Sequence, residues 1–170
     1  MNSQERDAPT RIRNQIQNYG DPYLPEMKPD EVAVCRECRS VFSNGRWQLE
    51  SEAGRELKEA KQVTEVLCPA CQKIRDRVPG GVLTISGRFA ADREQEIVNL
   101  VNNENAIAMK INPLERIMDI ERSDDGMVVY TTNEKLAQKV GRALKKAYDG
   151  KVEYQWPEDG KLVRVNWHRD

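Results

Sequence analysis

The pattern of apolar and polar positions divides this chain of 170 residues into three stretches. Residues 1–30 hold four prolines and few apolar side chains, so burial cannot offset the entropy of ordering them, and we expect a flexible N-terminal arm. Residues 31–79 contain short apolar runs between charged residues, which indicates a small module. Residues 80–170 show both strand-like and helix-like periodicity, which predicts an α+β domain.

The third stretch has the clearest periodicity. In chain order, it predicts a strand at 82–86, a helix at 88–110, a hairpin of 116–122 and 127–131, a helix around 136–147 capped by Thr131 and Glu134, and a last hairpin of 152–156 and 163–167. Strict alternation in both arms of the last hairpin indicates half-buried antiparallel strands. The order βαββαββ predicts a ferredoxin-like βαββαβ domain with an extra C-terminal edge strand.

The second stretch predicts short elements around two cysteine pairs. Asn44-Gly45 between two apolar runs is a strong hairpin signal, because a type I′ turn needs positive φ at both positions. Residues 51–62 favour a helix with Ser51 as its cap, and residues 72–77 form a helical turn after the second pair. A knuckle, a hairpin and then ligands at a helix start is the order of a treble clef, with a zinc ribbon as the alternative.

All four cysteines of the chain stand in two C-x-x-C pairs, Cys35 with Cys38 and Cys68 with Cys71. A C-x-x-C turn presents two thiolates to one metal ion, and two such turns supply the four soft ligands of a tetrahedral zinc site. With four thiolates the coordination is closed, so the zinc is expected to be structural. A stretch of this size has little core of its own, and metal binding should therefore fold it.

Three other interpretations of the cysteines remain. Disulfides need an oxidising compartment, whereas the chain opens on Met1 and polar residues without the apolar segment of a secretory signal, which favours the cytoplasm. A thioredoxin-like dithiol needs one pair after a strand of a βαβ unit, and these pairs stand outside such a pattern. The third alternative is four unligated structural cysteines.

Overall composition excludes some partners. Hydrophobic residues make up 38% of the chain and charged residues 32%, and no apolar run approaches the ~20 residues of a membrane span, so no membrane partner is expected. The formal net charge is −1, so any surface for nucleic acid must come from local clustering of basic side chains.

Candidate catalytic residues are few. His168 is the single histidine and no cysteine stands near it, so we expect a solvated side chain. Asp124 and Asp125 fall in a tight turn, where Asx side chains stabilise the backbone. No glycine motif matches a phosphate-binding loop, and no serine or cysteine has an evident histidine partner. We predict no enzyme and no small-molecule substrate.

Basic residues cluster around the cysteine pairs, beside one tryptophan. The candidate RNA-binding residues are Arg36, Arg39, Arg46, Trp47, Lys73, Arg75, Arg77 and Arg88. Guanidinium groups held by a zinc knuckle suit phosphates, and an aromatic ring suits a stacked base. The alternatives are a solvated surface neutralised by the glutamates of 50–65, and a Trp47 packed against the zinc site.

Several motifs together resemble a known group of proteins. They are the two cysteine pairs, Gly45-Arg46-Trp47, Gln72–Arg77, Pro79-Gly80-Gly81 with Gly87, Pro113–Met118 and Leu162–Trp167. The chain is similar, over about residues 19–168, to small bacterial relatives of the nonsense-mediated-decay-three family, whose larger members are adaptors for export of the large ribosomal subunit. The further C-x-x-C pairs of those adaptors and a nuclear-export segment are absent from this sequence.

The resemblance implies a zinc-binding protein that acts on ribosomes or ribosomal RNA, with Cys35, Cys38, Cys68 and Cys71 as the ligands. Our leading hypothesis is a non-enzymatic protein that associates with rRNA, and with a ribosomal protein as a further partner, and affects ribosome assembly, stability or dormancy. The alternative is a zinc-folded protein–protein adaptor that does not contact nucleic acid. A redox-responsive zinc switch is a third hypothesis.

Overall fold

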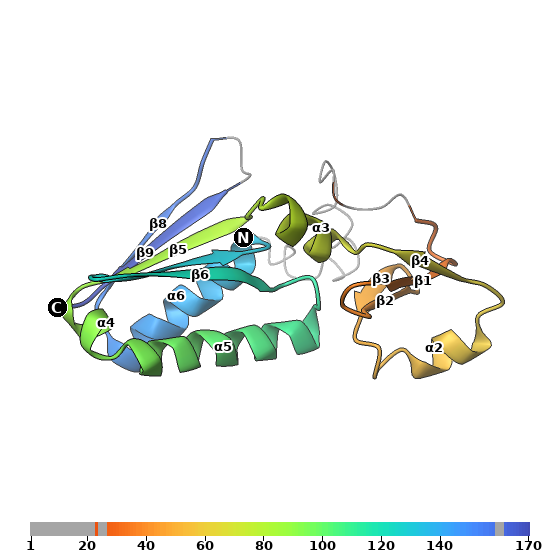
Figure 1. Cartoon of the computed structure of the whole chain (residues 1–170), viewed down its shortest axis with the longest axis horizontal. Helices are drawn as coiled ribbons and strands as arrows, with labels where there is room; N and C mark the ends of the chain where they lie inside the picture. Colours follow the sequence, from red (N-terminus) through yellow and green to blue (C-terminus); the bar gives the residue numbers. More distant parts are fainter. Residues whose placement is uncertain (1–22, 24–26, 159–161) are drawn as a thin grey trace, which may run out of the picture.

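The computed structural model describes residues 23, 27–158 and 162–170, which form two sheets with five helices (Figure 1). The predicted α+β class is confirmed. Most of the predicted N-terminal arm, and the centre of the turn predicted at Pro157–Gly160, lie outside the described residues. Among the described helices, none has both the length and the apolar character needed to cross a bilayer.

The first sheet is small and has the strand order β3-β2-β1-β4. Its members are β1 (Val32–Cys35), β2 (Val41–Ser43), β3 (Arg46–Gln48) and β4 (Val63–Val66). The first three pair antiparallel, and β4 pairs parallel to β1. The predicted hairpin is confirmed: Asn44 and Gly45 connect β2 to β3 with φ of 52° and 75°.

Helix α2 (Gly54–Glu59) connects β3 to β4 and differs from the sequence prediction. It is shorter than the predicted 51–62, it buries no side chain, and its N-cap is Ala53 without a side-chain hydrogen bond. The prediction that Ser51 caps this helix was therefore wrong. Strand β4 was not predicted, because Val63, Thr64 and Glu65 are all exposed and show no alternation between a buried and a solvated face.

Helix α3 (Pro69–Asp76) follows β4 and leads into the second sheet. Cys68 is its N-cap, and Pro69 occupies the first helical position, where a missing N–H costs no intrahelical bond. The helix ends at Arg77, which adopts a left-handed conformation with φ of 55°. The second cysteine pair thus stands on the first turn of a helix.

The second sheet has the strand order β6-β7-β5-β9-β8. Its strands are β5 (Gly81–Ser86), β6 (Ile117–Ser123), β7 (Gly126–Thr131), β8 (Lys151–Gln155) and β9 (Val163–His168). The last strand was predicted at the edge, and this is wrong: β9 lies between β5 and β8 and runs parallel to β5. Val163, Val165 and Trp167 of β9 are fully buried, whereas β8 is largely exposed, so the more apolar arm of the hairpin takes the inner position.

Three helices cover one face of this sheet, namely α4 (Arg88–Asp92), α5 (Glu94–Ile111) and α6 (Glu134–Tyr148) (Figure 1). The single helix predicted at 88–110 is broken at Arg93, whose φ of −123° is not helical. The N-cap of α6 is Asn133, which accepts a hydrogen bond from the backbone of Leu136, so the predicted Thr131–Glu134 capping box was wrong. Thr131 belongs to β7 instead.

We call residues 31–79, with the first sheet, the first unit, and residues 80–170, with the second sheet, the second unit. The core of the second unit lies between these helices and the sheet. Large buried side chains from β5, β7, β9, α5 and α6 form one cluster, with Trp167 at 0% exposure. The indole of Trp167 donates a hydrogen bond of 2.8 Å to the carbonyl oxygen of Asp149, which satisfies its buried N–H. On the opposite face, α3 borders one end of the sheet, where Ile74 and Tyr130 line a common cavity (Figure 1).

Candidate metal centre

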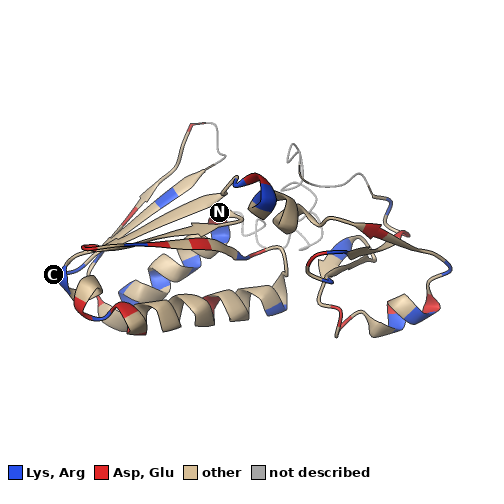
Figure 2. Cartoon of the chain, in the orientation of Figure 1, with Lys and Arg blue, Asp and Glu red and all other residues tan. Residues whose placement is uncertain are grey.

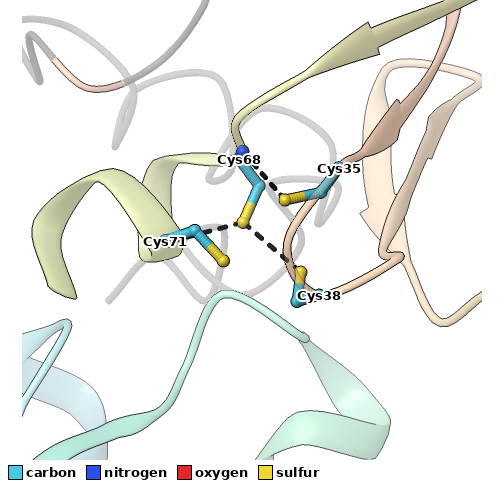
Figure 3. A group of neighbouring side chains, drawn as sticks. All are labelled: Cys35, Cys38, Cys68 and Cys71. Carbon is cyan, nitrogen blue, oxygen red and sulfur yellow. Dashed lines mark hydrogen bonds between the residues drawn. The ribbon is translucent and has the colours of Figure 1, made fainter. Parts of the chain in front are cut away.

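The four cysteines come from three elements that meet between the two sheets (Figures 1 and 3). Cys35 ends β1, and Cys38 lies in the turn that leads to β2. Cys68 and Cys71 lie at the N-cap and in the first turn of α3. The parallel pairing of β1 with β4 brings the two C-x-x-C turns together, because Cys35 is opposite Val66, two residues before Cys68.

The sulfur atoms have the spacing of a tetrahedral metal site. All four Sγ atoms lie within 4.8 Å of one another, and those of Cys38 and Cys68 are 3.7 Å apart. With zinc–sulfur bonds of about 2.3 Å, the edge of a tetrahedron is about 3.8 Å. A disulfide needs about 2.05 Å between sulfur atoms, and all four cysteines are free thiols. The donor set therefore fits one metal ion such as zinc and not two disulfides.

Backbone amides point at two of these sulfur atoms. The N–H of Cys68 donates to Cys35 Sγ at 3.3 Å, and the N–H of Cys71 donates to Cys68 Sγ at 3.4 Å (Figure 3). Hydrogen bonds from N–H groups stabilise the thiolate, which is the form that binds a metal. These two bonds support a thiolate at Cys35 and at Cys68 as soon as a cation is present.

A guanidinium group from the second unit completes the surroundings of the thiols. Arg116 Nη2 donates to Cys38 Sγ at 2.8 Å, and Nη1 donates to Cys71 Sγ at 3.5 Å. The same side chain donates through Nε to the carbonyl oxygen of Pro113 at 2.6 Å and through Nη2 to Ser40 Oγ at 3.2 Å. Arg116 is buried, and sequence reasoning missed it because 45 residues separate it from the nearest cysteine.

The surroundings shift the pKa values of the thiols in different directions. A hydrogen bond from Cys68 lowers the pKa of Cys38 to about 3 against the effect of burial, and Arg116 and Ser40 lower it further. Donation to Cys38, together with burial, raises the pKa of Cys68, and burial raises the pKa of Cys71 to about 11. The surroundings therefore favour the thiolate form at Cys38, next to the arginine, over that at Cys68 and Cys71.

An apolar cluster shields the thiols on the side of the first sheet. Cys35 and Cys68 pack with Ala33, Phe42, Trp47 and Ala70, and Leu114 reaches this cluster from the second unit. The rings of Phe42 and Trp47 meet edge to face with centroids 5.6 Å apart. Six buried residues form this cluster, and Val34, Val41 and Ala53 form a second one, so the core of residues 31–79 is small. That metal binding folds this part of the chain stays a prediction.

The predicted RNA-binding residues fall into two groups in the structure. In the first group, other parts of the protein already engage the side chains. Arg39 pairs with Glu50 at 3.0 Å, and Arg75 pairs with Asp76 at 2.9 Å. Lys73 donates to the carbonyl oxygen of Thr132 at 3.3 Å. Trp47 is only 8% exposed and packs beside the thiols, so its ring is closed to a stacking base.

The second group consists of exposed arginines that do not converge on one place. Arg36 lies in the first knuckle, Arg46 begins β3, and Arg77 follows α3, all in or next to the metal-binding unit. Arg88 begins α4, at the end of the second unit that lies far from the cysteines (Figure 1). Arg36 thus lies beside the candidate metal centre. Arg46 lies at the end of the first sheet opposite to Cys35, Arg77 at the C-terminal end of α3, and Arg88 in the other half of the molecule.

His168 has a partner that the sequence did not reveal. Because β5 and β9 pair in parallel with Ser86 opposite His168, Ser86 Oγ lies 3.1 Å from His168 Nδ1. His168 Nε2 lies 3.3 Å from a carboxylate oxygen of Asp170. The expectation that no serine has a histidine partner was therefore wrong. His168 and Asp170 are both largely exposed, so the three side chains form a hydrated chain at the sheet surface.

The comparisons with known proteins add no assignment. No family model matches this chain, and no curated protein sequence matches it. The class of protein is therefore defined by its own fold and site, as an α+β protein with a cluster of four thiols that fits a metal ion.

Proposed function

We propose that this protein is a non-enzymatic, cytoplasmic zinc protein that associates with ribosomal RNA and affects ribosome assembly, stability or dormancy. The observation that carries the proposal is the cluster of four thiols within 4.8 Å, placed where the two units of the fold meet. A closed set of four thiolates suits a structural metal, and reducing conditions in the cytoplasm keep such thiols available.

Zinc would be held by Cys35, Cys38, Cys68 and Cys71, and it supplies a rigid crosslink between two loops of a unit with a small core. We interpret this unit as a treble clef, because a knuckle and a hairpin precede a helix whose first turn carries the second cysteine pair. Arg116 offsets part of the negative charge that four thiolates and one divalent cation leave. The metal would thereby fix the surface around the cysteines.

The RNA part of the proposal rests on three exposed guanidinium groups in and next to the metal-binding unit, those of Arg36, Arg46 and Arg77. Arginine forks bind phosphate oxygens in pairs of hydrogen bonds, and a rigid module presents them at low entropic cost. The similarity to ribosome-directed adaptors favours ribosomal RNA over other RNAs, and a ribosomal protein is an expected second contact.

Co-sedimentation of the zinc-loaded protein with ribosomes tests this proposal. Binding should weaken steeply between 50 and 200 mM salt, because phosphate contacts release counterions. The double variant Arg36→Glu, Arg46→Glu should release the protein from ribosomes. The matched control is Lys58→Glu, Lys61→Glu, which makes the same change of charge at exposed positions of the same unit. Equal binding of both double variants, or binding insensitive to salt, would contradict rRNA contact.

The alternative is a zinc-folded adaptor that docks proteins and does not touch RNA. It is favoured by a cavity of about 380 Å³ at the junction of α3 with β6 and β7, lined by Ile74, Pro79, Met118 and Tyr130 among others. Ile74 and Val78 beside it are exposed apolar side chains. On this alternative, Ile74→Asp abolishes capture of ribosomal material after ribonuclease treatment, whereas reversal of Arg36 and Arg46 leaves it intact.

A further inference from the structure

The outer face of α6 carries a stripe of basic side chains. Lys135, Lys139, Arg142 and Lys146 follow one another at intervals of four, three and four residues, which places them on one side of the helix. The opposite side carries Leu136, Ala137, Val140, Gly141 and Leu144, all buried in the core. The basic side therefore faces away from the sheet, and α6 as a whole has five basic residues and one acidic residue.

Part of this charge is not neutralised by the protein. Lys139 forms an ion pair with Glu115 at 2.6 Å, and Lys145 pairs with Asp149. Arg142 and Lys146 are exposed, and neither has an acidic partner within the described part of the chain. Blue segments succeed one another along α6 in Figure 2, whereas the neighbouring α5 is mostly tan. A positive strip thus borders a largely uncharged one.

Two exposed aromatic side chains lie on or just beyond β8, the edge strand that packs beside α6. Tyr154 of β8 is 39% exposed, and Trp156, just beyond β8, is 61% exposed. A methyl group at Gly141 of α6 would lie 3.8 Å from the hydroxyl oxygen of Tyr154, so the tyrosine ring packs at the flank of α6 that turns toward the sheet and borders the basic side from there. Exposed rings beside cations are the combination that binds single-stranded nucleic acid, where phosphates meet the charges and unpaired bases stack on the rings.

We propose that the outer face of α6, together with Tyr154 and Trp156, binds single-stranded RNA. The proposal deepens the rRNA association proposed above, on which it rests, and adds a second surface remote from the knuckle arginines. A duplex keeps its bases stacked inside the helix, where they cannot stack on Tyr154 and Trp156. This surface should therefore bind single strands more tightly than duplexes. The apolar side of α6 is occupied by the core, which leaves no apolar side to insert into a lipid surface.

The tryptophans allow a direct test. Trp47 and Trp167 are 8% and 0% exposed, so Trp156 is the tryptophan open to a stacking base. Titration of the full-length, zinc-loaded protein with a short unstructured RNA should quench tryptophan emission in a saturable manner. The same RNA in a duplex should bind more weakly. Trp156→Phe should remove the quenching, and Trp156→Ala should weaken binding measured by fluorescence anisotropy of labelled RNA by about five-fold or more.

Charge variants complete the experiment. Arg142→Gln, Lys146→Gln should weaken binding of the RNA and flatten its salt dependence, because two phosphate contacts are lost. The matched control Lys58→Gln, Lys61→Gln should bind as the unaltered protein does. An unaltered affinity of the Arg142 and Lys146 variant overturns the inference. So does equal quenching by duplex RNA or by polyglutamate, which would assign the strip to acidic proteins.

The failure of this inference and that of the proposed function are distinguishable. RNA binding on α6 without co-sedimentation with ribosomes contradicts the ribosomal role and supports the surface. Co-sedimentation that depends on Arg36 and Arg46 but not on Arg142 and Lys146 supports the ribosomal role and overturns the α6 surface.

Discussion

At the scale of single residues, Arg116 links the two units most directly. Its guanidinium is buried and donates to Cys38 and Cys71, while its backbone N–H donates to Thr132 Oγ1 in the second unit. Burial opposes the charge on Arg116, yet its bonds to the thiols raise its pKa overall. A buried cation is stable only where anions surround it, so this arginine and the thiolates depend on each other.

Arg116→Gln should therefore lower the affinity for zinc by about 10- to 100-fold, the range known for groups that support metal ligands from the second layer. Competition with a chromophoric chelator measures the change. Arg122→Gln is the matched control, since Arg122 is an exposed arginine that pairs with Glu94 and is remote from the thiols. Equal affinities for the two variants would show that the guanidinium does not stabilise the bound metal.

Gly126 begins β7 with φ of 146°, in the region that favours glycine. A methyl group there would lie 2.0 Å from the carbonyl oxygen of Ile85, so Gly126→Ala both strains the backbone and clashes with a neighbouring strand. We expect a loss of about 1–3 kcal/mol or more in the free energy of unfolding. Gly54→Ala is the control, because no atom lies within 4 Å of its added methyl. Urea unfolding followed by tryptophan emission measures both, and equal midpoints would contradict the clash.

Among the helices and strands, the helix N-caps are where the structure differs from the sequence prediction. Asn133 caps α6 through its side chain, whereas Ser51 has no such role at α2. Asn133→Ala should reduce the free energy of unfolding by about 0.5–2 kcal/mol, and Asn133→Asp should restore most of it. Ser51→Ala should leave it within about 0.5 kcal/mol. An effect of Ser51 as large as that of Asn133 would reverse these assignments.

Elements with a strong local signal were predictable. The Asn44-Gly45 turn and α6 follow from turn chemistry and from a helical apolar stripe, and both are in the structure. The C-x-x-C spacing likewise pointed to the four thiols that meet. Local pattern does not contain the order of strands, however. The inner position of β9 and the existence of β4 depend on parallel pairings between segments at least 30 residues apart.

At the candidate metal centre, the sequence predicted the four cysteine ligands but not the residues that surround them. Arg116 reaches the thiols because the loop after α5 folds back on the first unit, and no spacing rule connects position 116 with positions 35–71. Trp47 and the basic residues near the cysteine pairs were predicted to bind RNA because of their residue types and their positions in the sequence. Whether such a side chain is exposed, paired or buried depends on neighbours such as Glu50 and Phe42, which tertiary packing selects.

At the scale of the whole molecule, the two units differ in what stabilises them. The second unit has a continuous core that includes Leu83, Val129, Leu144 and Trp167, whereas the first has two small clusters of buried residues, one of them around the cysteines. Structural zinc supplies on the order of 10–16 kcal/mol in small zinc modules. The metal should therefore determine whether residues 31–79 are folded, while residues 80–170 hold together without it.

Removal of the metal with a chelator under reducing conditions tests this division. Trp47 lies in the first unit and Trp167 in the second, so variants that keep only one of them report on each unit. With Trp156 also replaced by phenylalanine, the emission of Trp47 should shift to the red as its ring enters water, while that of Trp167 stays unchanged. Added zinc should restore the first signal. A shift of both tryptophans together would show that Arg116 and α3 make the fold one cooperative unit, and a shift of neither would show that the first unit folds without metal.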